Sequence, residues 1–118
     1  MKRRMAVLSL ALILITGCGT VSNLFSPKDA ERAMVTLTAL QHFRHESASA
    51  VAEAYVAGLV SVEQAQKVAS IDSEFRETWQ RAAHLVVLWR ASGDKPPGID
   101  ELLHVLTGMI VQIEEAKP

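Results

Sequence analysis

Apolar residues recur at spacings of three and four over most of the chain after residue 26, the pattern of amphipathic helices. In the first stretch the apolar stripe consists of Ala30, Ala33, Met34, Leu37, Ala48, Val51, Tyr55 and Leu59. In the two later stretches the stripes are Val68, Phe75, Trp79, Ala82, Val86 and Trp89, then Ile99, Leu103, Leu106, Ile110 and Ile113. No strand-like alternation competes with this pattern, so the sequence predicts an all-α fold.

The first helix is bounded by residues that commonly start and stop helices. Ser26 is predicted as its N-cap, with Pro27 at the first helical position, where a missing N–H costs nothing. The helix is expected to run to about residue 57, where Gly58 favours a stop. Only about three residues then connect it to the next helix, so the two must be antiparallel neighbours.

The second helix opens with a capping-box pattern at Ser61-Val62-Glu63-Gln64 and is expected to end at Gly93. A loop rich in proline and glycine at 94–98 separates it from a third helix over residues 99–116. We therefore expect residues 27–118 to form an antiparallel hairpin of two long helices plus a shorter third helix, a three-helix up-down-up bundle.

The third helix is predicted to be too short to cover the whole hairpin. Folding back from the loop, it is expected to reach along the second helix only from Trp89 to about Phe75. Large exposed apolar patches usually mark interaction sites. We predict a dimerisation or partner surface on the uncovered half, formed by Ala48, Val51, Tyr55, Val68 and Ile71. A bent third helix or mutual packing of the two long helices would instead hide these residues, and both interpretations stay open.

Arg44 is a charged residue inside the apolar stripe of the first helix. Counting outward from the turn near residue 60 places Arg44 one helical turn from Asp72, which lies at the edge of the second stripe. We predict an ion pair between Arg44 and Asp72 that fixes the register of the two helices rather than adding stability. In the alternative, Arg44 extends its aliphatic stem over the core and places its head in water.

Four histidines raise the question of a metal site. His42 and His45 are three residues apart on the first helix, a spacing at which metal ligands occur. Both point away from the apolar stripe, so a solvated face is the simpler interpretation, with a zinc or copper site as the alternative. The Glu114–Glu115 pair is expected to be solvated, and no residues form a catalytic pattern. We expect no cofactor and no enzymatic activity.

The N-terminus follows a different pattern. Lys2, Arg3 and Arg4 precede an apolar run over residues 5–15, which is shorter than the ~20 residues needed to span a bilayer. The run leads into Ile15-Thr16-Gly17-Cys18. This segment resembles the signal of bacterial lipoproteins. A cleaved signal peptide with a chance cysteine, or an uncleaved anchor, is the alternative.

The lipoprotein resemblance implies a signal peptide over residues 1–17, cleavage between Gly17 and Cys18, and lipid modification of Cys18. The lipidated cysteine and a short tether would then occupy residues 18–26, with enough acyl chains for stable anchoring to the membrane. In that family an aspartate after the cysteine retains the protein in the inner membrane. Gly19 stands there, which favours the inner leaflet of the outer membrane.

Removal of the signal changes the charge of the chain. The sequence has 12 Lys and Arg against 13 Asp and Glu, and the loss of three basic residues leaves nine, a net charge of −4. An acidic domain without a basic cluster argues against nucleic-acid binding. The expected partners are the membrane, through lipidated Cys18, and an unknown envelope protein or a second copy of the chain.

The run from Tyr55 to Ala65, Tyr-x-x-Gly-x-x-Ser-x-Glu-x-Ala, resembles small helical lipoproteins of unknown function, some of them carried on prophages. The leading hypothesis is a non-enzymatic, membrane-anchored envelope lipoprotein that acts as a small helical interaction module. One alternative, implied by the resemblance, is an exclusion lipoprotein that blocks an envelope protein. The other is a metal- or ligand-handling periplasmic protein that uses His42 and His45.

Overall fold

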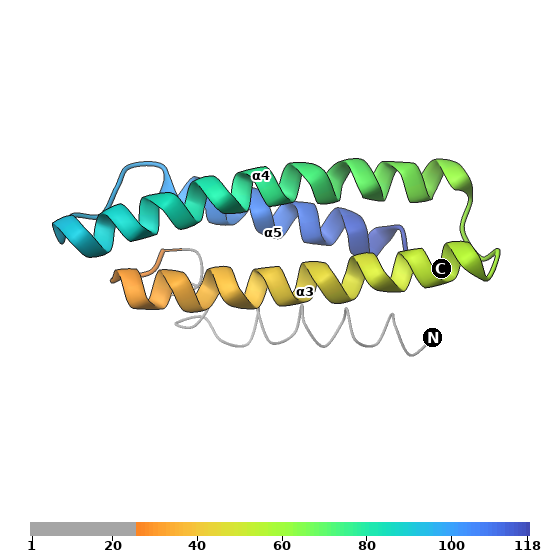
Figure 1. Ribbon diagram of the computed structural model, residues 1–118, viewed down its shortest axis with the longest axis horizontal. Coiled ribbons are helices and arrows are strands. Elements are labelled where there is room, and N and C mark those ends of the chain that lie inside the picture. The colour runs from red at the N-terminus through yellow and green to blue at the C-terminus, as the bar shows by residue number, and fades with distance from the viewer. Residues whose placement is uncertain (1–25) are drawn as a thin grey trace.

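The computed structural model describes residues 26–118, which form three helices packed against one another (Figure 1). Helix α3 spans Ala30–Val56, α4 spans Val62–Ser92 and α5 spans Ile99–Glu115. Each helix contacts both others, and this part of the chain contains no strand. The predicted all-α class and three-helix bundle are confirmed. The predicted cleavage and lipidation sites at Gly17 and Cys18 lie outside the described residues.

Helix α3 begins three residues later than predicted. Its N-cap is Asp29, in an extended backbone conformation, and the Asp29 carboxylate accepts a hydrogen bond from the Arg32 N–H at 2.8 Å. Pro27 is buried ahead of the helix rather than in its first turn. The prediction of Ser26 as the N-cap is therefore wrong, because the Ser26 hydroxyl donates to Asp100 instead.

The boundaries of α4 and α5 agree with the sequence. Ser61 Oγ accepts from the Gln64 N–H at 3.1 Å, and Gln64 Oε1 accepts from the Ser61 N–H at 3.2 Å, which completes the capping box. Helix α4 ends at Gly93, whose φ of 78° lies in the left-handed region where a side chain would be strained. Helix α5 starts directly after the loop, at Ile99.

The core consists of two apolar clusters. The larger lies nearer the α4–α5 loop and joins all three helices; Leu37, Phe75 and Leu103 are fully buried within it. The smaller lies nearer the α3–α4 turn and is formed by Val51, Ala54, Val60, Val68, Ile71 and Ile113. Met109 of α5 packs against both clusters.

Helix α5 reaches further over the hairpin than its length predicted. Ile113, in its last turns, is fully buried in the smaller cluster against residues of α3 and α4. Val60, from the turn itself, closes the end of that cluster. The expected limit of α5 near Phe75 is therefore wrong, because the third helix fills the gap between the other two well beyond that point.

Candidate interaction surfaces

The predicted partner surface is largely internal. Val51, Val68 and Ile71 are buried in the smaller cluster, and Ala48 is half-buried. Their assignment to a partner surface is wrong, because Ile113 and Val60 cover the apolar side of the hairpin that two helices alone would leave open. Tyr55 remains 45% exposed.

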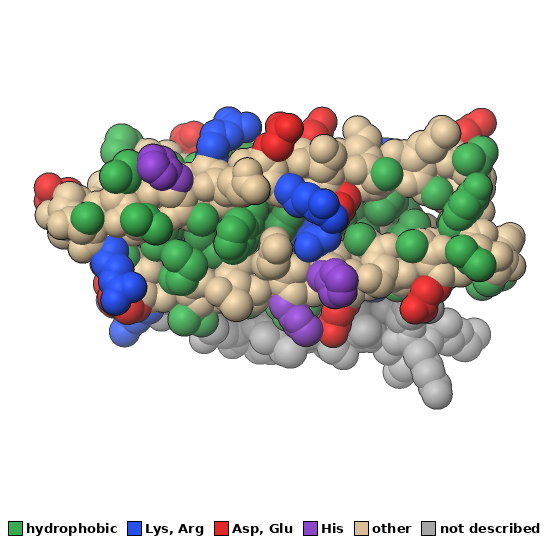
Figure 2. All heavy atoms as spheres, in the orientation of Figure 1, with side chains coloured by type: hydrophobic (Ala, Val, Ile, Leu, Met, Phe, Trp, Pro, Cys, Tyr) green, Lys and Arg blue, Asp and Glu red, His purple; other side chains and the backbone are tan. Residues whose placement is uncertain are grey.

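Exposed apolar side chains gather instead at the α3–α4 turn. Residues 55–62 read Tyr-Val-Ala-Gly-Leu-Val-Ser-Val, with a single hydroxyl at Ser61 besides the phenol of Tyr55. Val60 points inward, and its large apolar neighbours are left in solvent (Figure 2). We call these four exposed residues the turn patch: Tyr55 at 45%, Val56 at 87%, Leu59 at 65% and Val62 at 51% exposure.

The predicted ion pair between α3 and α4 is present. Arg44 Nη1 donates to Asp72 Oδ1 at 2.8 Å, and the two side chains are only 8% and 17% exposed. Arg76 Nε lies 3.2 Å from the other carboxylate oxygen of Asp72. The Arg44 guanidinium is also 5.9 Å from the centroid of the Phe75 ring, within cation–π range. The charged head of Arg44 is therefore held between the helices and does not extend into water.

A second polar cluster joins α3 to the end of α5. Ser47 Oγ donates to Glu114 Oε1, and Lys117 Nζ donates to the same oxygen at 2.6 Å. Ser47 is buried, and the side chains of Glu114 and Lys117 are nearly so. The expectation that Glu114 is solvated is wrong, since the last turn of α5 packs on α3. Ser47 lies four residues before Val51 and therefore falls on the apolar stripe of α3. This position is the sequence signal that could have indicated its burial.

We call these two neighbouring polar clusters the polar layer. On α3, Arg44 and Ser47 lie between the buried residues of the larger and the smaller apolar clusters, whereas on α5 Glu114 follows Ile113 of the smaller cluster. Buried polar residues select one alignment of packed helices when their partners meet only in that alignment, as polar residues do in helical bundles. The layer therefore favours one register of the three helices.

The two candidate metal ligands lie on the exposed side of α3. His42 Nε2 is 3.1 Å from Glu46 Oε1, and both side chains are well exposed. Within residues 26–118, no group of three His, Cys, Asp or Glu side chains lies close enough together to hold a metal ion. The hypothesis of a site at His42 and His45 thus gains no third ligand from the described part of the fold.

An open groove runs between α3 and α4, on the face shown in Figure 2. Its walls are mainly apolar and include Met34, Val35, Ala39, Val86 and Val87. Glu31 and Arg90 lie at one end of the groove, with Arg90 Nε 3.6 Å from Glu31 Oε1, and His42 lies at the other end. Helix α5 contributes no residue to this groove.

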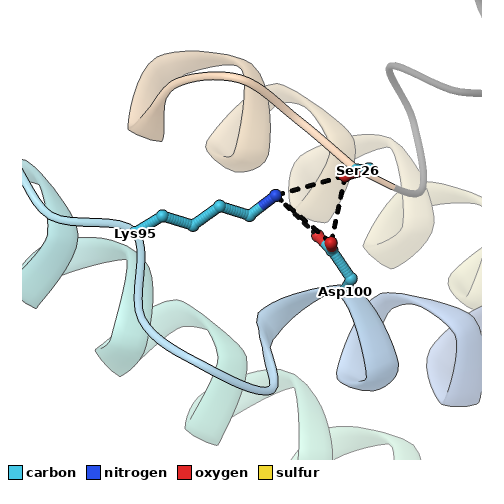
Figure 3. Close-up of polar contacts among 3 residues, drawn as sticks. All are labelled: Ser26, Lys95 and Asp100. Atoms are coloured by element: carbon cyan, nitrogen blue, oxygen red, sulfur yellow. Dashed lines mark hydrogen bonds and ion pairs between the residues drawn. The ribbon is translucent and has the colours of Figure 1, made fainter.

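The start of the described chain is fixed beside the α4–α5 loop. Ser26 Oγ donates to Asp100 Oδ2 at 3.0 Å, and Lys95 Nζ donates to both atoms at 3.2 Å (Figure 3). Lys95 Nζ also lies 5.7 Å from the centroid of the Trp89 ring. These contacts hold Ser26 beside the α4–α5 loop. Figure 1 shows that this loop lies at the end of the bundle opposite the α3–α4 turn.

Comparisons with known proteins give no relative: no family model, no curated protein and no solved structure matches the chain. Within residues 26–118, every helix is too short or too polar to cross a membrane.

Proposed function

We propose that this protein is a non-enzymatic, lipid-anchored envelope lipoprotein that acts as a small helical interaction module. The observation that carries the proposal is the position of the turn patch relative to Ser26. Ser26 is held at one end of a bundle 49 Å long, and the turn patch lies at the other end. A lipid on Cys18, eight residues before Ser26, would hold the first end at the membrane and direct the turn patch away from it.

The composition of the turn patch suits a protein partner. Its residues are a tyrosine and three branched aliphatic side chains, and aromatic and aliphatic residues form the buried centres of protein interfaces. Glu63 lies beside Val62, and the domain is acidic after removal of the signal, which disfavours docking onto anionic lipid. The partner expected here is a protein with an apolar recess.

The anchor is tested by Cys18→Ser in the full chain. We expect the variant to move from the membrane fraction to the soluble fraction, because the thiol that would carry the lipid is gone. Gly19→Asp is the matched control: it keeps the thiol, so the protein should stay with membranes and shift towards the inner membrane. A Cys18→Ser variant that stays with the membrane would exclude the lipid anchor.

The interaction surface is tested by a photo-crosslinking residue at position 59 in living cells. We expect one dominant adduct there, lost when Val56→Asp is added. Val105 on α5 is also about half exposed and provides the control position. Equal labelling from positions 59 and 105 would contradict the proposal that the turn patch is a specific interaction surface.

A further inference from the structure

We propose that the groove between α3 and α4 is the dimer interface of the protein, filled by the same groove of a second copy. Val35, in the second turn of α3, and Val87, near the end of α4, line it and are 69% and 57% exposed, a large apolar exposure on two packed helices. Helix α5 already covers another side of the hairpin, so two copies facing each other through the groove would bury what a single chain leaves open. This proposal rests on the proposed function at one point only: the lipid anchor helps to decide in which direction the two copies are oriented.

Symmetry allows two face-to-face arrangements. With a two-fold axis parallel to the helices, α3 of one copy lies on α4 of the other, and both Ser26 ends point the same way. With an axis perpendicular to the helices, α3 lies on α3 and the Ser26 ends point in opposite directions. Two copies anchored through Cys18 to one membrane fit only the parallel axis.

The charges at the end of the groove also favour the parallel axis. Glu31 and Arg90 lie at the same height along the bundle, since their side chains are 3.6 Å apart within one chain. A rotation about an axis parallel to the helices preserves height, so Glu31 of each copy faces Arg90 of the other. Each dimer thereby gains two complementary charge contacts at the rim of the interface.

The apolar residues match in the same arrangement. Val35 is four residues after Glu31 on α3, and Val87 is three residues before Arg90 on the antiparallel α4. Val35 of one copy therefore faces Val87 of the other at the centre of the groove. The four long helices then form an antiparallel four-helix bundle in which each helix has two antiparallel neighbours.

A charge swap tests the pairing directly. Two full-length chains are prepared with different tags, one carrying Glu31→Arg and the other Arg90→Glu. Each chain alone places like charges across the interface and should self-associate on the order of tenfold or more weakly than the wild type. In the mixture, the two substituted side chains attract each other at one contact, and the native Arg90 and Glu31 meet at the other. The two chains should therefore co-purify as a heterodimer of doubled mass in mild detergent.

Cysteine crosslinking tests the axis. One tagged chain carries Val35→Cys and the other Val87→Cys, and an added oxidant should join them, because a disulfide needs Cβ atoms about 3.8 Å apart. Val35→Cys paired with Val105→Cys, on α5, is the matched control and should stay unlinked. Crosslinking of Val35→Cys to itself alone would replace the parallel axis with the perpendicular one and overturn the arrangement.

The outcomes separate this proposal from the lipid anchor. A wild-type chain that is monomeric in detergent and shows no crosslink overturns the dimer, whatever Cys18→Ser does. A photo-crosslinking residue at position 35 that captures a different protein, and never a second copy of this chain, would also overturn the dimer. A Val35–Val87 crosslink combined with a Cys18→Ser variant that stays in the membrane would leave the dimer standing and reject the anchor.

Discussion

The two ends of the bundle are built in opposite ways. At the Ser26 end, the surface contacts are polar, between Ser26, Lys95 and Asp100, and they lie over the larger apolar cluster. At the α3–α4 turn, the surface is apolar and lies over the smaller cluster. The first end contains most of the apolar core and exposes Val35 and Val87 in the groove between α3 and α4. The second end has only the smaller cluster and leaves the four residues of the turn patch in solvent. We infer that the first end supplies most of the stability and that the turn patch serves binding.

The largest expected effect is on the larger cluster. Phe75→Ala should lower the free energy of unfolding by about 3–5 kcal/mol, because it opens a cavity where α3, α4 and α5 meet. Val51→Ala, equally buried in the smaller cluster, should cost only about 1.5–2 kcal/mol, since it removes two methyl groups. Denaturant unfolding of the full chain measures both. A loss for Phe75→Ala no larger than that for Val51→Ala would contradict the central position of Phe75 in the larger cluster.

The polar layer comes next. Asp72→Ala should destabilise the fold by about 1–3 kcal/mol, because it leaves the nearly buried Arg44 guanidinium without its carboxylate. Glu74→Ala is the matched control, since it removes an exposed carboxylate from the same helix and should change the stability by less than about 0.5 kcal/mol. A double-mutant cycle on Arg44 and Asp72 gives their coupling energy. A coupling of zero would leave the pair without an energetic role in holding the register.

Arg44 and Glu114 show what the sequence can and cannot predict about the polar layer. Arg44 interrupts a regular apolar stripe, and the short turn over residues 57–61 fixes which residues of the next helix can face it, so Asp72 was predictable. Glu114 lies at the end of a helix that follows a longer loop, and its height over α3 depends on how that loop folds. The loop conformation is held by tertiary contacts of Lys95, which no local pattern encodes.

The helix starts teach the same lesson. The capping box at Ser61 is a local interaction of residues three apart, and it was predicted correctly. Ser26 and Asp29 are both good N-caps, and local propensity does not choose between them. The contact of Ser26 with Asp100, 74 residues away, decides the choice. The reach of α5 into the smaller cluster was missed for the same reason, because the burial of Ile113 against Val51 and Val68 is a tertiary feature.

The N-cap of α4 is expected to have an intermediate effect. Ser61→Ala should lower the stability by about 1 kcal/mol, because it leaves the Gln64 N–H without its acceptor. Ser26→Ala is the matched control at the other end and should cost less, because that hydroxyl is exposed and caps no helix. Hydrogen exchange at the first turns of α4 and α3 locates each effect. Faster amide hydrogen exchange in the first turn of α3 in the Ser26→Ala variant would show that Ser26 acts as a helix cap after all.

The smallest effect on stability is expected in the turn patch. Val56→Gln should change the free energy of unfolding by less than about 0.5 kcal/mol, because Val56 is 87% exposed and the fold makes almost no use of its side chain. Val60→Gln, four residues later and buried, should be clearly destabilising, because it places an amide in the smaller cluster. The same Val56→Gln variant should lose the adduct formed from position 59. If Val56→Gln unfolded the protein, the turn patch would belong to the fold and would not be a surface reserved for binding.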